Sequence, residues 1–309
     1  MRNSCILIFS RSLYAIVLIG GTVPPLIFNY IALRTRQWLK IDFNENRTDI
    51  GDPNEKIDIL VPTTAKDRVV LKQMIDSLKK NVCHPIGEVH ILAFENPDIV
   101  AFCKDNGYHF VEKKSVLGYG EERMPFMYKG VDRSGWVFQQ LVKLSGEKIV
   151  KTRRYLSVDS DTILIHPHIF IQGKNNDTVV LRHNTEWHER YFRAFEELFG
   201  YEVPTRLSFT SHMMLFDTKH LVAMKKEIEQ KKGKSWDQAY IDLIGSNEAS
   251  PMSDYDTYAN WVLYNHPDKV RTKPLYNAGL PRTEFDTLEN LVKKYGHRYK
   301  TLSFHSWIR

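Results

Sequence analysis

The sequence predicts an α/β fold, in which a mixed sheet carries helices on both faces, because two kinds of segment alternate along the chain. Apolar runs typical of strands alternate with runs that repeat apolar residues at helical spacing: KIDILVPTT, RVVLKQMIDSLKKNV, GEVHILAF, PDIVAFCKDNG and YHFVEKKSVL. This alternation is typical of parallel strands joined by helices that cover both faces of one sheet. The length of 309 residues, with 42% hydrophobic residues, suits one large domain or two modest ones.

An uncharged segment precedes this α/β region. Residues 12–33, SLYAIVLIGGTVPPLIFNYIAL, are long enough to cross a hydrocarbon core of roughly 30 Å. We therefore expect a short tail over 1–11, a single-pass membrane anchor over 12–33, a polar stem over 34–55 and the main domain over 56–309. A cleaved signal peptide and a helix buried in the protein are the alternatives. Basic residues flank both ends of the run, so the side of the membrane stays open: the Golgi lumen in a eukaryote, the cytoplasmic face in a bacterium.

The alternation is interrupted at residues 118–135, which contain four glycines and a proline. Loops beyond the carboxyl ends of strands bind ligands in α/β sheets, so this segment predicts either a lid or a disordered insert. The helix WVFQQLVKLSGEKIV then leads directly into the strand RYLSV. The second half is mixed and predicts two strands around a turn, a helix, a strand, two helices, a late strand and a packed last segment: IFIQGKNNDTVVLRH, WHERYFRAFEELFGY, RLSFTSHMMLFD, KHLVAMKKEIEQKK, DYDTYANWVLYNH, KVRTKPLYNA and TLSFHSWIR.

The charge and the cysteines argue against several classes of protein. The net charge of +6 is spread along the chain without a basic block. None of the zinc-finger, homeodomain or RNP signatures is present, so we expect no nucleic-acid partner. The three cysteines are widely spaced and form no CxxC pair, which indicates neither a disulfide framework nor a zinc site.

Two aspartates, Asp159 and Asp161, follow the strand RYLSV, at the sheet edge where α/β proteins place their sites. Two carboxylates at i and i+2 repel one another unless a cation lies beside them, and hard oxygen ligands favour Mg²⁺ or Mn²⁺. Apolar residues on both sides of the pair raise the cost of keeping it without a purpose. The alternative is that both aspartates are capping or turn residues.

One enzyme class that uses this arrangement is the haloacid-dehalogenase-like phosphatases. The stretch YLSVDSDTI is close to their pattern of hydrophobic residues followed by D-x-D-x-[TV], with Ile163 at the last position. That class also needs a later strand with an acidic pair. The nearest candidate, Asp237 with Asp242 in SWDQAYID, is expected to be helical.

The chain from about Lys56 to its end resembles more broadly the nucleotide-sugar-dependent glycosyltransferases of the GT-A fold, which is Rossmann-like. A first strand ends in ILVPTT, an α/β half follows, and D-S-D comes after it. The chain also resembles a poorly characterised glycosyltransferase-like family of bacterial polysaccharide loci. This resemblance depends on the order of five stretches: GWVFQQLVKL, DSDT, SFTSHMMLFD, SDYDTYANWV and SFHSWI.

The resemblance implies a divalent metal, Mn²⁺ or Mg²⁺, with Asp161 as a direct ligand and Asp159 on the ribose or on a metal-bound water. It implies His305 as a third ligand, and an exposed residue near the chain end is the alternative. It implies Asp254 as the general base of an inverting displacement, although Asp254 also suits a helix N-terminus. Asp256, two residues later, is a competing base or a contact for a sugar.

The resemblance also places residues around the substrates. His212 would contact the donor or acceptor sugar, with a core histidine as the alternative. The residues implied for binding the nucleotide donor are Thr63, Lys66, Asp67, Gln140, Lys143 and Ser160.

These features predict a membrane-anchored, metal-dependent glycosyltransferase that moves a sugar from a nucleotide diphosphate sugar to a glycan or glycolipid acceptor. A UDP-sugar is the default donor. The alternatives are the phosphatase and a catalytically inactive glycan-binding protein of the same fold. A sugar nucleotidyltransferase is disfavoured because no G-x-G-x-R loop follows the first strand.

Overall fold

The computed structural model of the chain describes residues 25–50, 54–173, 177–184, 186, 188–245, 248–306 and 308. Its centre is a five-stranded sheet, which contains in spatial order β10 (Met213–Asp217), β6 (Arg154–Val158), β1 (Ile57–Pro62), β2 (Ile86–Ala93) and β3 (His109–Glu112). Four of these strands are parallel, and β10 runs antiparallel to β6. The predicted mixed α/β sheet is confirmed.

The first half alternates strands and helices as predicted. Helix α3 (Arg68–Asn81) connects β1 to β2, and α4 (Pro97–Asn106) connects β2 to β3. The side chain of Asn96 accepts two backbone N–H groups in the first turn of α4. Gly107 ends this helix in the left-handed conformation, with φ of 68°, which glycine adopts without strain.

The third strand is shorter than the predicted run YHFVEKKSVL. It ends at Glu112, whose carboxylate accepts the N–H of Ser115 at 2.9 Å. This bond caps the short helix α5 (Lys113–Leu117) and therefore ends the strand.

Residues 118–135, predicted as either a lid or a disordered insert, contain a 3-10 turn, η3 (Glu121–Arg123), and a two-stranded hairpin of β4 (Met127–Tyr128) and β5 (Val131–Asp132). The segment is held to the domain, because Tyr119 donates a hydrogen bond to Asp237 at 2.6 Å. Most of this segment is therefore structured.

Helix α6 (Ser134–Lys143) is shorter than the predicted helix over 136–150. It is followed by the 3-10 turn η4 (Gly146–Lys148). A side chain at Gly146 would collide with the ring of Tyr155 on β6, so only glycine lets the turn pack this closely on the strand.

Two smaller three-stranded sheets belong to the second half. They contain, in spatial order, β11 (Val270–Pro274), β9 (Thr178–His183) and β8 (Ile171–Gln172), and β12 (Asn277–Pro281), β13 (Thr301–His305) and β7 (Thr162–Leu164). The predicted strand over 206–217 contains only β10, because His212 has a left-handed φ of 57° that an extended strand does not accommodate.

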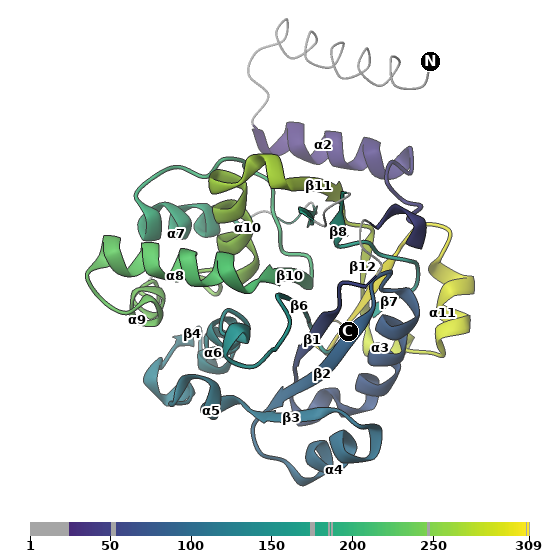
Figure 1. The fold of residues 1–309 in the computed structure, drawn as a ribbon, viewed down its shortest axis with the longest axis horizontal. Helices are drawn as coiled ribbons and strands as arrows, with labels where there is room; N and C mark the ends of the chain where they lie inside the picture. The colour runs from purple at the N-terminus through teal and green to yellow at the C-terminus, as the bar shows by residue number, and fades with distance from the viewer. Residues whose placement is uncertain are drawn as a thin grey trace, which may run out of the picture.

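The helices of the second half are α7 (Glu189–Phe199), α8 (Thr218–Lys232), α9 (Trp236–Ile241), α10 (Asp254–Asn265) and α11 (Leu288–Tyr295), with 3-10 turns η5 (Pro267–Lys269) and η6 (Arg282–Glu284). Helices α7 to α10 gather on one side of β6 and β10, and α3 and α11 lie on the other side of the sheet (Figure 1). The helical reading of SWDQAYID is confirmed, since it forms α9.

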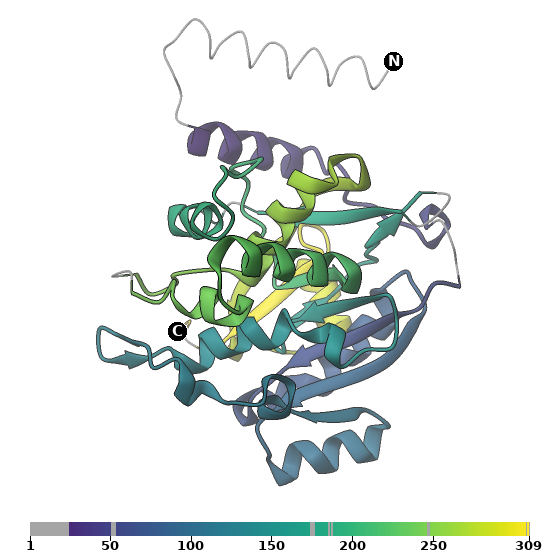
Figure 2. The ribbon, with the colours of Figure 1, turned by 60° about the vertical axis from the view of Figure 1, so that its left-hand side comes forward.

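The predicted membrane anchor lies largely outside the described residues, which begin at Pro25. From there the chain forms helix α2 (Pro25–Trp38), which lies across one end of the domain, with α4 at the opposite end (Figures 1 and 2). In the part of the chain that the structure describes, no helix combines the length and the apolar character needed to cross a membrane.

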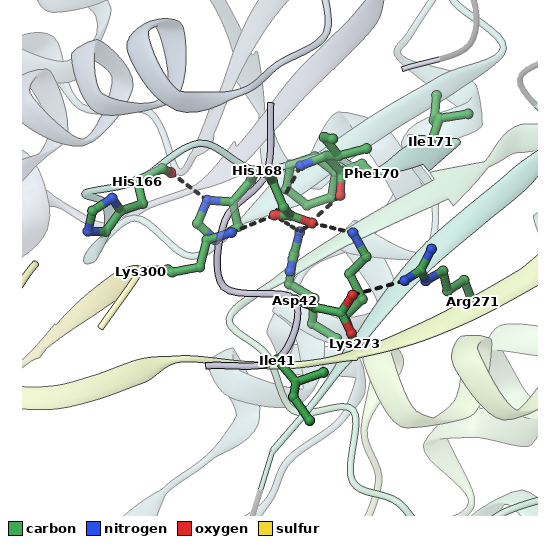
Figure 3. A network of polar contacts seen from close by, with 12 residues as sticks. Ile41, Asp42, His166, His168, Phe170, Ile171, Arg271, Lys273 and Lys300 are labelled. Atoms are coloured by element: carbon green, nitrogen blue, oxygen red, sulfur yellow. Dashed lines mark hydrogen bonds and ion pairs between the residues drawn. The ribbon is translucent and has the colours of Figure 1, made fainter. Parts of the chain in front are cut away.

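The segment predicted as a stem, residues 34–55, contributes a buried carboxylate to the domain. Glu45 is 3% exposed. Its oxygens lie 2.8 Å from Arg182 Nη2, 2.6 Å from Lys273 Nζ and 2.6 Å from Lys300 Nζ. The two lysines approach this carboxylate from opposite sides (Figure 3). Burial would raise the pKa of Glu45, but Arg182 and Lys300 above all lower it well below its ordinary range.

Candidate functional site

Several segments meet at the edge of the central sheet where β1 and β6 end. The two strands are parallel and in register, with Leu60 opposite Ser157, so their carboxyl ends coincide. Strand β10 is antiparallel to β6 and begins at this edge. Strand β13 ends beside the start of β7, because Ser303 pairs with Thr162. The residues that flank these strand ends therefore come together.

Asp159 directly follows β6 and is held from three directions. Its N–H donates to the carbonyl of His212 at 2.9 Å. Its Oδ1 lies 3.2 Å from Lys143 Nζ and accepts the hydroxyl of Tyr255 at 3.2 Å. Burial would raise the pKa of Asp159, but the Lys143 ammonium and His212 lower it below its ordinary range. Asp159 is therefore an ionised carboxylate with a fixed cation.

Lys143, at the end of α6, is a buried cation that contacts two carboxylates. Its side chain is 4% exposed, and Nζ lies 3.2 Å from Asp159 and 3.3 Å from Asp254. The ammonium also lies 4.0 Å from the ring centre of Tyr255. Burial would lower the pKa of Lys143, but the two carboxylates raise it well above its ordinary value. The residue therefore stays charged inside the protein.

The second aspartate, Asp161, faces the last strand. Its Oδ2 lies 3.3 Å from Nδ1 of His305, and its carbonyl accepts the N–H of Phe304 at 2.9 Å. The rings of His305 and His212 are 5.4 Å apart. Nδ1 of His212 lies 3.5 Å from Asp159 Oδ2. The structure thus brings together Asp159, Asp161, His212 and His305, which we call the His–Asp cluster.

The backbone at His212 is strained. Its φ of 57° is rare for a residue with a side chain, yet it turns the imidazole toward Asp159. Burial would lower the pKa of His212, but its hydrogen bond with Asp159 and the charge of that carboxylate raise it. Strain of this kind is common where a side chain must be aimed at a site.

The residue types of the His–Asp cluster suit a divalent cation, although their positions do not enclose one. Carboxylate oxygens are the ligands that Mg²⁺ and Mn²⁺ prefer, and imidazole nitrogen is acceptable to Mn²⁺. Within the described residues, no three or more His, Cys, Asp or Glu side chains are close enough together to hold a metal jointly. Asp161 lies beside His305 and Asp159 lies beside His212, and Asp159 also has the Lys143 ammonium beside its other oxygen.

The residues expected to bind the nucleotide form a network next to the cluster. The carboxylate of Asp67 accepts the hydroxyl of Thr64 at 3.0 Å and that of Ser160 at 2.9 Å. Its other oxygen is paired with Arg282. Ser160 lies between the two aspartates of the pair, so Asp67 is linked directly to the D-S-D turn.

The two other expected residues at the end of β1 differ in exposure. Thr63 is 1% exposed, and its carbonyl accepts the Lys113 ammonium at 2.9 Å. Lys66 is exposed, and its carbonyl accepts a hydrogen bond from Arg282 at 2.6 Å. Only Lys66 presents its side chain to solvent.

Asp254, the expected general base, is the first residue of α10 and is 1% exposed. Its N–H donates to Gln140 Oε1 at 2.7 Å, and its carboxylate lies 3.3 Å from Lys143. Burial raises the pKa of Asp254 to about 6, with Lys143 acting in the opposite direction. Gln140 and Lys143 were expected at the nucleotide, but both are buried and bound to the start of α10 and to Asp159.

Asp256 has a structural environment. Its oxygens accept the N–H of Phe209 at 2.8 Å, the hydroxyl of Thr210 at 3.0 Å and that of Ser253 at 3.0 Å. The side chain is 1% exposed, so these bonds hold the segment that leads to His212. A direct contact with a sugar is not what this geometry favours.

No pattern in the sequence singles out three further residues of the site. Tyr255 stands between two singled-out aspartates, and its hydroxyl bonds Asp159. Arg282 binds Asp67 and donates to the carbonyl of Phe304 at 3.3 Å, but in the sequence it is a lone arginine after a strand. Lys113 is buried, which lowers its pKa to about 8, whereas the sequence pattern assigns it to a strand.

The acidic pair considered for a phosphatase, Asp237 and Asp242, has partners outside the His–Asp cluster. Asp237 accepts the hydroxyl of Tyr119 and pairs with Arg123 at 3.3 Å. Asp242 pairs with Lys234 at 2.7 Å. Neither carboxylate contacts the His–Asp cluster in the contacts that the structure describes.

Among known proteins, the chain matches one family and is distantly similar to several solved structures. The model of a family of unknown function, DUF6492, matches residues 56–274. No curated protein matches the chain.

Three solved structures illustrate the distant similarity. Mouse xyloside xylosyltransferase 1, in its apo form, is 13% identical over 81% of this chain and 98% of its own, with a TM-score of 0.43. The galactosyltransferase LgtC, with donor and acceptor sugar analogs, is 12% identical over 81% and 88%, with a TM-score of 0.42. The bifunctional glycosyltransferase WbbM is 12% identical over 86% and 48%, with a TM-score of 0.46. Because these TM-scores lie below 0.5, the likenesses carry no weight in assigning a function.

Proposed function

We propose that this chain, which belongs to the family of unknown function DUF6492, is a metal-dependent glycosyltransferase that uses a nucleotide diphosphate sugar, by default a UDP-sugar. The observation that carries the proposal is the meeting of Asp161 and His305, 3.3 Å apart, at the sheet edge where β6 ends. The D-S-D turn supplies an oxygen ligand and the last strand supplies a nitrogen ligand, at the sheet edge where α/β proteins bind their ligands. The acceptor is proposed to be a glycan or a glycolipid.

In this proposal Asp161 and His305 hold Mn²⁺ or Mg²⁺, with Asp159 beside them. Such a metal, when bound, neutralises the charge of the diphosphate leaving group. Lys143 keeps Asp159 ionised and fixes its direction. Lys143 therefore acts as a positioning residue and does not contact the nucleotide.

The donor nucleotide is proposed to lie along the end of β1. Asp67 and Ser160 are bonded to each other there, and Lys66 is exposed beside them. Arg282 holds Asp67 and the Lys66 carbonyl from the side of β12. A carboxylate in this place accepts hydroxyl donors, which suits the ribose of a nucleotide. His212 and Asp159 then lie on the side of the donor sugar.

Asp254 has two roles that its geometry allows. As a general base, a carboxylate with a pKa of about 6 accepts a proton near neutral pH, and inversion depends on this role alone. As the partner of Lys143, Asp254 holds that ammonium in place and does not contact the substrate, which agrees with its exposure of 1%. Two variants, Asp254→Asn and Lys143→Met, separate these roles. If both variants lose donor affinity equally, Asp254 acts as the partner of Lys143. If Asp254→Asn loses sugar transfer while its donor affinity is unchanged, Asp254 acts as the general base.

The experiment that tests the proposal measures binding and turnover separately. Calorimetry with Mn²⁺ and UDP on the full chain should show binding that Asp161→Ala weakens at least tenfold, because a metal ligand is lost. Asp105→Asn, on the exposed side of α4, is the matched control and should bind as the parent does. A screen of UDP- and GDP-sugars should then show nucleotide release that requires Mn²⁺ or Mg²⁺.

Other outcomes contradict the proposal in distinct ways. Equal binding of Mn²⁺ and UDP by the parent and Asp161→Ala would show that the site is assigned wrongly. Release of phosphate from a small phosphomonoester, without nucleotide release from any sugar nucleotide, would favour the phosphatase. Glycan binding without any turnover would favour the inactive binding protein.

A further inference from the structure

Helix α2 turns an apolar face away from the protein. Ile27, Tyr30, Ile31 and Trp38 recur at the spacing that puts residues on one side of a helix, with Arg34 among them. The exposed fractions of these apolar side chains are 46% for Ile27, 49% for Tyr30, 42% for Ile31 and 81% for Trp38. Leu33, on a different side, is 2% exposed and faces the domain. A helix on the surface of a soluble protein has its polar side outward, whereas α2 has apolar residues on its outer side as well as its inner side.

The concentration of apolar side chains on this helix is local. Of the eleven large apolar residues exposed in the described part of the chain, five lie between Ile27 and Leu39. Single exposed apolar residues need no explanation, whereas a contiguous group marks a surface that binds something apolar. The uncharged run that begins at Ser12 leads directly into this helix.

The helix is attached to the domain by polar contacts on its inner side. Gln37 Nε2 donates to the carbonyl of Leu275 at 2.7 Å. The hydroxyl oxygen of Tyr276 lies 3.1 Å from the carbonyl oxygen of Arg36 and 2.5 Å from that of Ile41, so its one proton is shared between them. Figure 2 shows α2 along one end of the domain, so its outer face is part of the molecular surface at that end.

A basic cavity of about 560 Å³ lies beside the end of α2, and Arg34 and Trp38 of the outer face are among the residues that line it. Arg34 and Lys40 line it from the helix side, and Arg298 lines it from the turn after α11. The rings of Trp38, Tyr276 and Tyr299 form part of its walls. Among the described residues that line the cavity there is no aspartate or glutamate, so its charge is complementary to an anion.

We propose that this end of the protein docks on an anionic phospholipid surface, with the outer face of α2 in the interface and a lipid phosphate in the cavity beside Arg34, Lys40 and Arg298. Aromatic and aliphatic side chains with basic residues among them are the composition of helices that lie along a membrane. This is a peripheral contact of α2 with the membrane surface and differs from a helix that crosses it. It does not depend on the proposed enzyme activity.

The first experiment measures binding of the full chain to vesicles by flotation. Binding to vesicles of phosphatidylcholine with phosphatidylglycerol should exceed binding to phosphatidylcholine alone at least tenfold and should weaken with salt, because lipid charge contributes. The double variant Arg34→Glu with Lys40→Glu should lose at least tenfold of this binding. Lys226→Glu with Lys232→Glu makes the same change of charge on exposed positions of α8 and should bind as the parent does.

The second experiment asks whether α2 itself enters the interface. Brominated lipids should quench the tryptophan fluorescence of the bound parent. Trp38→Phe should stay bound and lose most of this quenching, whereas Trp136→Phe, on α6, should keep it.

Four results would overturn the proposal. They are equal binding to neutral and anionic vesicles, insensitivity to the charge reversal at Arg34 and Lys40, unchanged quenching in Trp38→Phe, and binding of soluble glycerol phosphate to this cavity without any binding of vesicles. The last result would assign the cavity to a free phosphate compound.

Discussion

Lys143 Nζ lies 3.2 Å from the carboxylate of Asp159, so the first aspartate of the D-S-D turn already has a cation beside it. The same ammonium lies 3.3 Å from Asp254 on α10. A helix that precedes β6 and a helix near the end of the chain are thus connected through one buried charge. Asp254 depends on this charge most, since its side chain is 2% exposed, whereas that of Asp159 is 24% exposed.

Replacement of Lys143 by Met should therefore destabilise the protein strongly. Removal of one member of a buried ion pair leaves its partner uncompensated, which costs about 3–5 kcal/mol of the free energy of unfolding. Urea denaturation of the parent and Lys143→Met measures this difference. Addition of Asp254→Asn to Lys143→Met should restore part of the loss, because one uncompensated charge is then removed.

Lys151 provides the matched control for that change. It pairs with Glu88 at 3.3 Å, but its side chain is 80% exposed. Lys151→Met should change the free energy of unfolding by less than about 1 kcal/mol, as exposed ion pairs do. Equal effects of the two lysine variants would mean that the Lys143 contacts contribute no more than a surface pair.

Removal of the charge of Glu45 should also destabilise the protein. Glu45→Gln leaves Arg182, Lys273 and Lys300 near one another without a carboxylate, at a cost of about 3–5 kcal/mol. Denaturation by urea at neutral pH measures the change, and the exposed Glu202→Gln is the control. The addition of Lys300→Met should recover part of the loss, and no recovery would contradict a role for charge.

The same residue predicts a loss of stability in acid. The pKa of Glu45 in the folded protein lies well below its ordinary value of 4.5, so the folded state favours the ionised form. The stabilisation of the folded protein by the ionised Glu45 is complete above pH 4.5 and is lost as the pH falls below that value. The difference in stability between the parent and Glu45→Gln should therefore shrink on acidification below that point.

His84 predicts a second, higher window of pH. Its Nε2 accepts the N–H groups of Phe170 at 3.0 Å and Ile171 at 3.2 Å, so the ring must stay neutral. Burial, with a smaller effect of Arg154, lowers the pKa of His84 from 6.5 to about 4. The unfolded chain then binds the proton first, and the folded protein loses stability as the pH falls from 6.5 toward 4.

His84→Gln keeps an acceptor near the position of Nε2 but does not titrate. It should be less stable than the parent at pH 7.5, with a smaller decline in unfolding free energy between about pH 6.5 and 4. Guanidinium or urea titrations at several pH values measure this decline. His109→Gln, at an exposed position, should keep the parent's dependence on pH. An identical decline in His84→Gln would show that groups other than His84 cause the loss of stability between these pH values.

The left-handed backbone of His212 predicts a difference between two small replacements. A residue with a side chain loses roughly 1–2 kcal/mol in this conformation, and glycine loses about 0.5–1 kcal/mol of chain entropy on folding. His212→Gly should therefore be more stable than His212→Ala by about 1 kcal/mol, although both should bind Mn²⁺ and UDP less well. At Ser211, which does not have positive φ, the order of Gly and Ala should be reversed.

The repeated strand–helix pattern of the first half was sufficient to predict its order of elements. The lengths were less predictable, because they are set by single side chains such as Glu112, which caps α5, and Gly146, which packs on Tyr155. Strand β10 is short for a similar reason, since the fold at His212 depends on bonds from Asp256 on a distant helix. Pattern and propensity contain no information on such contacts.

The candidate site was predictable where its residues belong to recognisable stretches. The sequence singled out Asp159, Asp161 and His305, and the structure brings them to one edge of the sheet; their role as metal ligands stays a prediction. The partners of Asp254 were not predictable, because burial turns Lys143 and Gln140 inward. Arg282 was missed because its contact with Asp67 joins positions 215 residues apart.

The contact between Glu45 and Lys300 spans 255 positions of the chain and has consequences for the order of folding. Strands β1, β2 and β3 pair with their neighbours in sequence, and such local strand pairs are expected to form early in folding. The carboxylate of Glu45 meets its cations only after β9, β11 and the residue that precedes β13 have come together. This contact is therefore expected to close late, so that its removal accelerates unfolding far more than it slows folding.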